Sequence, residues 1–324
     1  MNLKLAFYFF MYAIVSLANS SSGHAQPAAN PSLVFMPRIA SDWWQVASNP
    51  DLDELTDASQ QPVDFGIWQA ADGTWQLWSC IRKTKETGNT RLFHRWEGAQ
   101  LTDKNWAPRG IAMRAETKFG ETPGGLQAPF VIKDGRQFLM FYGDWENICS
   151  AASTNGKSFV RRVAANGRTG LFGEGAGANA RDPMVLRIGN LWHCYYTAHQ
   201  NRKGAVYCRT SPNTREWSES KIVAVGGRAG DGPYSAECPF VVELSPGQFF
   251  LFRTQRYGLD AQTSVYHSTD PLDFGVNDDG KHFAGTLPIA APEIIRHDGK
   301  FYIAALMPDL KGIRIARLEW VPLK

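Results

Sequence analysis

The chain has 324 residues, of which 44% are hydrophobic and 20% are charged, and its formal net charge is +3. These fractions are close to the averages of globular proteins, so they exclude a disordered, collagen-like, coiled-coil or polytopic membrane protein. The near-neutral charge also argues against a nucleic-acid-binding protein, because such proteins usually carry a basic stripe.

The first 25 residues have the pattern of a secretory signal peptide. Lys4 precedes an apolar run over residues 5–17, and small residues follow. The run is shorter than the roughly 20 residues of a membrane-spanning helix, and Ala18 and Ala25 are candidate cleavage sites. We predict a signal peptide over 1–25, one domain over 26–324, a secreted or periplasmic location and no membrane span after cleavage. A retained N-terminal anchor is the alternative.

The cysteine and histidine patterns predict neither a disulfide scaffold nor a metal site. Five cysteines in a chain of this length are too few for a disulfide framework, and at least one thiol stays unpaired. Cys194 and Cys208 flank a turn-like stretch and could face each other across a hairpin, although two buried thiols can also lie close by chance. No Cys/His spacing is typical of zinc, so we predict no obligatory metal and no cofactor.

Short aromatic and β-branched runs, bounded by Gly, Asp, Asn and Pro, recur along the whole chain, and no long segment has helical periodicity. This pattern indicates a nearly all-β protein. One unit, made of an extended segment, a turn with Gly and an aromatic-rich strand, occurs five times. The copies span residues 64–80, 128–142, 182–197, 238–252 and 291–304.

A second marker keeps the same period. Each of the first four copies is followed by a short strand, a Ser/Thr turn and one aromatic, namely Trp106, Phe159, Trp217 and Phe274. A period of about 55 residues leaves room for four strands, and five such units close into a ring without long exposed edges. We therefore predict a single-domain, five-bladed β-propeller whose ring closes through the region Trp43–Val46. The alternative is a two-sheet sandwich with coincidental repeats.

Three carboxylates stand where the first strand of a blade begins, at the mouth of a propeller's channel. They are Asp64 in the first unit, Asp182 within Arg-Asp-Pro in the third, and Glu237 within Glu-Cys-Pro in the fourth. Glycoside hydrolysis uses such a set, because one carboxyl must protonate the leaving oxygen while another acts ionised as nucleophile or base. Crowding raises the pKa of one carboxyl, and Arg181 is expected to hold another ionised. Alternatively, the three groups only satisfy backbone donors or arginines around the channel.

This set resembles the five-bladed propeller superfamily that contains glycoside hydrolase families 43 and 32. The Arg-Asp-Pro and Glu-Cys-Pro runs match the family 32 motifs, whereas the sequence around Asp64 departs from that family's Asn-Asp-Pro-Asn-Gly run, so Asp42 and Asp51 are kept as alternatives. The resemblance implies Glu237 as general acid, Asp64 as nucleophile or base, and Asp182 as the carboxylate that sets the pKa and contacts substrate hydroxyls. The implied substrate is an oligo- or polysaccharide.

Aromatic side chains are the second part of a saccharide site, because the apolar faces of sugar rings stack on flat rings. Trp43 and Trp44 precede the first unit, Trp68 follows Asp64, and Trp145 follows Asp144 at the end of a strand in the second unit. We consider all of them, with Asp144, as candidate substrate-binding residues. For each Trp the alternative is packing between blades.

Gln127, Arg181 and Glu293 complete the candidate substrate-binding residues, since all three are expected at the channel mouth. Structural roles are equally open for Gln127 and Glu293. The sequence therefore predicts a glycoside hydrolase, with a non-catalytic carbohydrate-binding propeller as the alternative. A protein-interaction propeller is a third hypothesis, and it predicts an exposed apolar patch in place of a carboxylate-lined funnel.

Overall fold

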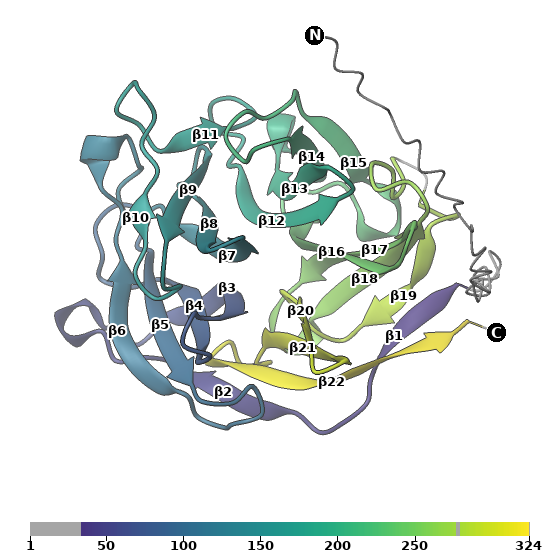
Figure 1. Ribbon diagram of the computed structural model, residues 1–324, viewed down its shortest axis with the longest axis horizontal. Coiled ribbons are helices and arrows are strands. Elements are labelled where there is room, and N and C mark those ends of the chain that lie inside the picture. The colour runs from purple at the N-terminus through teal and green to yellow at the C-terminus, as the bar shows by residue number, and fades with distance from the viewer. Residues whose placement is uncertain (1–33, 277–278, 324) are drawn as a thin grey trace, which may run out of the picture. The chain divides into compact units, whose positions relative to one another are not determined.

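The structure of the protein, a computed structural model, describes residues 34–276 and 279–323. Its strands form five antiparallel sheets that surround a central channel (Figure 1). The predicted all-β, five-bladed propeller is therefore confirmed, and the two-sheet sandwich is wrong. The predicted signal peptide lies outside the described residues. Within the described part of the chain, no helix is long and apolar enough to cross a membrane.

The first strand of each blade lies at the channel and the others follow outward in order. Blade I consists of β3 (Gln61–Gln69), β4 (Trp75–Arg82), β5 (Leu92–Gly98) and β6 (Ala107–Met113). Blade II consists of β7 (Gln127–Asp134), β8 (Gln137–Gly143), β9 (Ile148–Ser153), β10 (Val160–Arg161) and β11 (Gly170–Phe172). Blade III consists of β12 (Arg181–Ile188), β13 (Leu191–Ala198), β14 (Ala205–Ser211) and β15 (Lys221–Val225).

Blade IV and blade V complete the ring. Blade IV consists of β16 (Glu237–Ser245), β17 (Gln248–Arg256), β18 (Gln262–Ser268) and β19 (Phe283–Leu287). Blade V contains β20 (Glu293–His297), β21 (Lys300–Leu306) and β22 (Gly312–Pro322). Short 3-10 turns lie in the connections, at η1 (Asp53–Leu55), η2 (Thr117–Phe119), η3 (Gln200–Arg202), η4 (Gly227–Ala229) and η5 (Gly258–Asp260).

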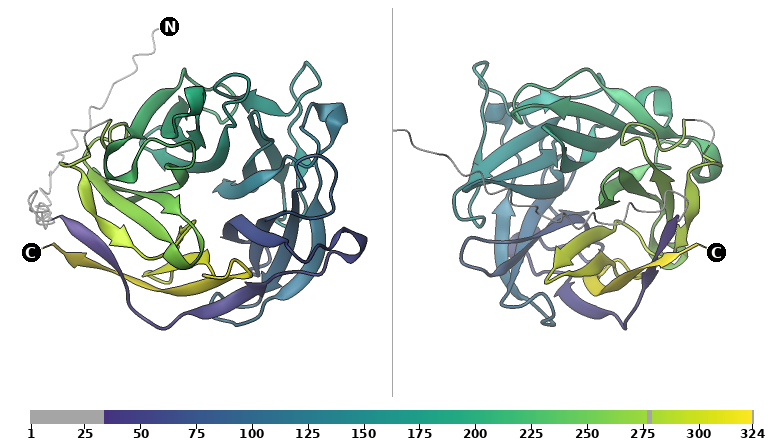
Figure 2. Two further views of the ribbon diagram at one scale, coloured as in Figure 1. Left: turned by 180° about the vertical axis from the view of Figure 1, so that it is seen from behind. Right: turned by 45° about the vertical axis from the view of Figure 1, so that its right-hand side comes forward.

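Strands from both ends of the described chain close the ring. β1 (Phe35–Ile39) and β2 (Trp44–Ser48) both pair with the long β22, antiparallel to it, so blade V combines N-terminal and C-terminal segments. Figure 2 shows the purple and yellow strands side by side at this seam. The predicted use of the region Trp43–Val46 is confirmed, because Trp44 lies opposite Ile315. The two N-terminal strands therefore cover the side of β22 that faces away from β21.

The recurring aromatics that revealed the period fill the wedges between blades. Phe159 of blade II packs against Trp68 and Trp78 of blade I, at ring-centroid distances of 5.8 and 5.4 Å. Trp217 of blade III contacts Phe141 of blade II at 5.9 Å. Similar contacts join blades IV and III through Phe274 and Tyr195, and blades V and IV through Trp320 and Phe250. The sequence repeat therefore records one packing requirement at successive blade interfaces.

A left-handed residue marks the start of the innermost segment in every blade. The residues are Asp64, Ala128, Asp182, Cys238 and Ala291, with φ angles of 38°, 44°, 55°, 47° and 50°. At this point the pairing register of β3, β7, β12 and β16 shifts, as in a β-bulge. In a regular strand consecutive side chains point to opposite faces. The bulge lets two consecutive side chains face the centre of the ring.

All five cysteines lie in the described part of the chain and all are free. The predicted facing of Cys194 and Cys208 is wrong by one residue, because Cys194 lies opposite Arg209 and Cys208 lies opposite Tyr195. Since neighbouring residues of a strand point to opposite faces, the two thiols lie on different faces of blade III.

The close approach of β2 to β22 generates a test of ring closure. A Cβ atom at Gly312 would collide with the carbonyl oxygen of Ala47, which belongs to the backbone and cannot move aside easily. We expect Gly312→Ala to lower the free energy of unfolding by about 2 kcal/mol. Urea unfolding measures this change. Gly232→Ala is the matched control, since nothing lies within 4 Å of its added Cβ, and equal losses in both variants would contradict the proposed seam.

Candidate active site

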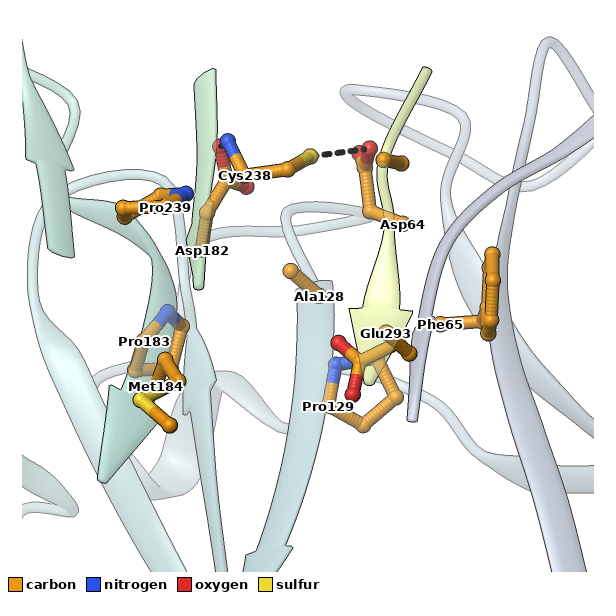
Figure 3. Close-up of a pocket in the computed structure, with 11 residues that line it drawn as sticks. Asp64, Phe65, Ala128, Pro129, Asp182, Pro183, Met184, Cys238, Pro239 and Glu293 are labelled. Atoms are coloured by element: carbon orange, nitrogen blue, oxygen red, sulfur yellow. Dashed lines mark hydrogen bonds between the residues drawn. The ribbon is translucent and has the colours of Figure 1, made fainter. Parts of the chain in front are cut away.

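Two hollows occupy the mouth and the interior of the channel, and Asp64 lines both. The outer one, which we call the funnel, is lined by Asp64, Arg82, Arg91, Gln127, Trp145, Asn179, Arg181, Tyr234, Glu237 and Tyr257. The inner one, which we call the channel pocket, is lined by side chains that include Asp64, Asp182, Cys238 and Glu293 (Figure 3). The three predicted carboxylates therefore converge from blades I, III and IV.

The bulge at each blade start distributes consecutive residues between these hollows. Arg181 and Glu237 line the funnel, while the residues that follow them, Asp182 and Cys238, line the channel pocket. Asp64 occupies the same blade position as Asp182, with the same left-handed backbone. The sequence suggested that the three carboxylates stand at one matching position in their blades. The structure shows that they do not. Glu237 lies one residue earlier, where blade III carries Arg181.

Arg181 joins the carboxylates of blades III and IV. Its guanidinium donates to Glu237 Oε1 from Nε at 3.3 Å and from Nη2 at 3.1 Å, whereas its nearest approach to Asp182 is 3.8 Å. Further bonds to the carbonyls of Asn179 and Pro233 fix its orientation. Arg181 therefore acts on Asp182, as expected, through an ion pair, but its closer contacts are with the predicted acid. Its two hydrogen bonds to a carboxylate go to Glu237.

Cys238 connects the other two carboxylates. Its backbone N–H donates to Asp182 Oδ2 at 3.0 Å, and its thiol donates to Asp64 Oδ1 at 3.3 Å (Figure 3). The hydroxyl of Tyr257 lies 3.2 Å from the same sulfur. One residue therefore sets the relative positions of Asp64 and Asp182 through its backbone and its side chain.

The buried environment shifts the acid–base behaviour of this cluster. Burial raises the pKa of Asp182 to about 7, with Asp64 and Glu237 reinforcing the rise and Arg181 opposing it. Burial also raises the pKa of Glu237, where Arg181 opposes and Asp64 reinforces the effect. Like charges close together in a partly dry pocket cannot all ionise at their ordinary pKa values. The arrangement favours the protonated forms of Asp182 and Glu237, and general acid catalysis needs a carboxyl that holds a proton.

Asp64, Asp182 and Cys238 are also near enough to contact one cation, with candidate ligand atoms within 4.8 Å of one another. In the structure the Cys238 thiol is used as a hydrogen-bond donor to Asp64, and its sulfur also lies 3.2 Å from the Tyr257 hydroxyl. Arg181 already supplies positive charge beside the carboxylates. The donor set therefore suits a hydrogen-bonded carboxyl cluster better than a metal site.

Two of the predicted substrate-binding residues besides Arg181 line the funnel. Gln127 begins β7, and Trp145 follows β8 with a left-handed backbone, φ 86°, which is unusual for a bulky residue. The guanidinium of Arg91 lies 5.0 Å from the centre of the Trp145 ring. Backbone strain of this kind is concentrated at functional sites, and here it holds an aromatic ring at the funnel wall.

The structure does not bring Trp43, Trp44 or Trp68 to the funnel. Trp68 is buried between blades I and II and donates to the Gly156 carbonyl. Trp44 packs against Tyr302 in blade V, and Trp43 lies under the Arg314 guanidinium at 4.2 Å. Each of these rings is used in packing at or within blades, the alternative considered from the sequence.

Asp144 and Glu293 lie near the funnel without lining it. Asp144 is buried and its carboxylate accepts the backbone N–H groups of Glu146 and Asn147 at 3.0 and 2.6 Å, so it shapes the turn that carries Trp145. Burial raises its pKa. Glu293 lines the channel pocket below the level of Asp64 (Figure 3), and burial raises its pKa well above the usual range.

Sequence reasoning missed several funnel residues, above all Arg82, Arg91 and Tyr257. For Arg82 and Tyr257 the sequence contains a signal, which is their place at the end of the second strand of a blade. Asp144–Trp145 was singled out because it ends the second strand of its blade, and the same position in blades I and IV is occupied by Arg82 and Tyr257. In blades I, II and IV the end of the second strand therefore meets the funnel.

With this geometry established, the relationship to known proteins is clear. The model of the family described as "Glycosyl hydrolases family 32 N-terminal domain" matches residues 69–321, more than half of the chain. The chain belongs to this family. It is thus a glycoside hydrolase by family, although the match begins after Asp64. Among curated proteins, none matches the chain significantly.

Solved structures share the family 32 and 43 propeller fold. A thermostable family-43 glycoside hydrolase has a TM-score of 0.60 and 16% identity, covering 86% of this chain and 93% of its own. An endo-arabinase from Bacteroides thetaiotaomicron has a TM-score of 0.59 and 11% identity, covering 87% and 97%. A family 32 β-fructofuranosidase from Bombyx mori has a TM-score of 0.55 and 16% identity, covering 80% of this chain and 59% of its own. This chain thus spans about three fifths of that last protein.

The raised pKa of Asp182 predicts a pH-dependent effect on stability. The unfolded chain loses this proton near the ordinary pKa of 3.8 and the folded protein near pH 7, so the carboxyl lowers the free energy of unfolding as the pH rises through this window. We compare the free energies of unfolding of Asp182→Asn and the unmodified protein. The difference between them should shift in favour of the variant by on the order of 3 kcal/mol when the pH is raised from 4 to 8. Urea unfolding at both pH values measures this.

Asp134→Asn is the control, because it removes an exposed carboxylate from the last residue of β7. Its stability relative to the unmodified protein should change little between the two pH values. A difference for Asp182→Asn that is equal at pH 4 and pH 8 would show that Asp182 titrates normally in the folded protein.

Proposed function

We propose that the protein hydrolyses glycosidic bonds of an oligo- or polysaccharide in the funnel, with Glu237 as general acid and Asp64 as nucleophile or base. The observation that carries the proposal is the convergence of carboxyls from blades I, III and IV around Arg181 in a member of glycoside hydrolase family 32. Glycoside hydrolysis requires one protonated and one ionised carboxyl at the scissile bond.

The environment of Glu237 suits the role of acid. Its side chain is 17% exposed, so it meets both the buried cluster and the funnel that would hold the substrate. Burial raises its pKa and keeps the proton available for the leaving oxygen, while Arg181 fixes the carboxyl in one orientation. After the proton has been donated, the same guanidinium stabilises the carboxylate that forms.

Asp64 lies on the blade opposite this acid–arginine pair and lines both hollows. The thiol of Cys238 donates to one of its carboxylate oxygens and so holds the group in position for attack on the sugar carbon or on a water. Asp182 is buried, and its Oδ1 has no hydrogen-bond partner among the described residues. We assign to Asp182 the setting of charge in the cluster and an interaction with substrate hydroxyls.

Replacing Glu237 tests this assignment directly. Glu237→Gln keeps the shape of the side chain but cannot donate a carboxylic proton, so we expect hydrolysis to fall at least about a thousandfold without loss of folding. The measurement is release of reducing sugar from a panel of polysaccharides. Glu243→Gln, near the opposite end of β16, is the matched control and should retain activity. Undiminished turnover in the Glu237 variant would end the assignment.

A non-catalytic carbohydrate-binding propeller is the second candidate, and the blade I sequence favours it. The family match begins at residue 69, so Asp64 and its surroundings lie outside it. Saccharide binding by the unmodified protein without any cleavage would decide for this candidate.

We also propose export from the cytoplasm, supported by Lys4, the apolar run over 5–17 and the small residues that follow. Expression of the full chain in a bacterial host should yield a periplasmic protein whose intact mass corresponds to cleavage after Ala18 or Ala25. A full-length mass in the membrane fraction would instead support the retained anchor.

A further inference from the structure

We infer that the saccharide bound in the funnel carries an anionic group, a carboxylate or a sulfate, which Arg82 and Arg91 bind. The inference rests on the proposed glycosidase function and names the substrate class of that same site. It follows from the partners of these two arginines, from the charge balance of the funnel and from its unpartnered hydrogen-bond acceptors.

Both arginines belong to blade I and lie at the two ends of one connection. Arg82 is the last residue of β4, and Arg91 directly precedes β5. Both line the funnel together with Asp64 and Glu237, and both are partly exposed there. A sugar placed between Asp64 and Glu237 would therefore have two guanidinium groups beside it on the blade I side.

Within the described part of the chain neither guanidinium contacts a carboxylate directly, although the charge of Arg91 lowers the pKa of Glu237 from a distance. Arg82 Nε donates to the neutral Gln61 side chain at 3.0 Å, and Arg91 lies over the Trp145 ring. Among the described residues, neither arginine forms an ion pair with a carboxylate, in contrast to Arg181 in the same funnel. Each therefore retains N–H donors and a full positive charge on the funnel wall.

The charge balance of the cluster also favours an anionic ligand. Arg82, Arg91 and Arg181 supply three positive charges in the funnel, against the carboxyls of Asp64, Asp182 and Glu237 and, deeper in the channel pocket, that of Glu293. The proposed general acid must be protonated before the reaction, and burial favours the protonated form of Glu293 by raising its pKa, so the positive charges outnumber the negative ones at that stage. A neutral sugar would cover the remaining positive charge without compensation, which is costly in a partly dry pocket. An anionic sugar would compensate it.

The hydrogen-bonding groups of the funnel suit both the anionic group of such a ligand and its sugar hydroxyls. A guanidinium presents a planar fork of donors that matches a carboxylate or a sulfate. In the same funnel, Gln127 Oε1 and Asn179 Oδ1 are buried and have no hydrogen-bond partner among the described residues. These acceptors suit sugar hydroxyls, because an unpartnered buried acceptor gains most from a new donor.

Matched pairs of probes test the inference. The full-length Glu237→Gln protein is titrated by calorimetry with trigalacturonate and its methyl ester, and with sulfated carrageenan oligosaccharides and their desulfated forms. We expect the acidic member of at least one pair to bind at least about tenfold more tightly than its neutral partner, with a preference that weakens at high salt. The carboxylate pair and the sulfate pair identify which anion the site takes.

Variants of the two arginines locate the effect. Arg82→Met and Arg91→Met should each reduce the preference for the acidic probe, whereas the corresponding Lys variants, which keep the charge without the planar fork, should retain part of it. Arg136→Met removes the same charge from the exposed turn between β7 and β8 and should leave the preference unchanged. Thermal unfolding of every variant shows whether it is folded.

The failure of this inference can be told apart from that of the proposed function. No preference for the acidic member of either pair, or a preference that both Met variants retain, overturns the anion site. Cleavage of neutral glycans alone, abolished by Glu237→Gln, also overturns it and leaves the glycosidase standing. An arginine-dependent preference without cleavage by the unmodified protein supports the anion site and counts against hydrolysis.

Discussion

The site depends on a local backbone constraint that recurs at the start of each blade. A strand that reaches the channel in regular geometry would turn only every second side chain to the centre. Here a left-handed residue and the accompanying bulge place Arg181 at the funnel and Asp182 at the channel pocket, and they do the same for Glu237 and Cys238. Non-glycine residues in this region of φ and ψ are strained by about 1–3 kcal/mol each. The packed ring therefore maintains conformations that an isolated strand would avoid.

Because two consecutive residues of a blade face the centre of the ring, charged groups from several blades come close together and shift each other's pKa values. Arg181 comes from blade III but makes its closest carboxylate contacts with Glu237 of blade IV, while Cys238 of blade IV links Asp182 of blade III to Asp64 of blade I. Blades III and IV thus exchange partners, and Cys238 joins them to blade I across the channel. Desolvation and mutual repulsion raise the pKa values of Asp182 and Glu237, and one buried guanidinium limits the rise.

Much of the architecture could be predicted from the chain because the propeller is a repeat of local units. The aromatics at Phe159 and Trp217 recur with the blade period because each blade must fill the same wedge against its neighbour. The carboxylates were found because they stand at the same end of the first strand in their blades. The tryptophans were harder to place. Trp68 and Trp145 have the same chemistry, yet one packs between blades and the other lines the funnel.

The sequence by itself determined the all-β class, the five-fold period, the closing strand near Trp44 and the three carboxyls, since each of these follows from local patterning. Only the tertiary structure decided which groups meet. The partner of Arg181, the bridge through Cys238 and the lack of an ion pair, among the described residues, at Arg82 and Arg91 depend on distances between blades that are far apart in the chain. Such distances are set by how five twisted sheets pack around one axis, and a linear pattern does not record them.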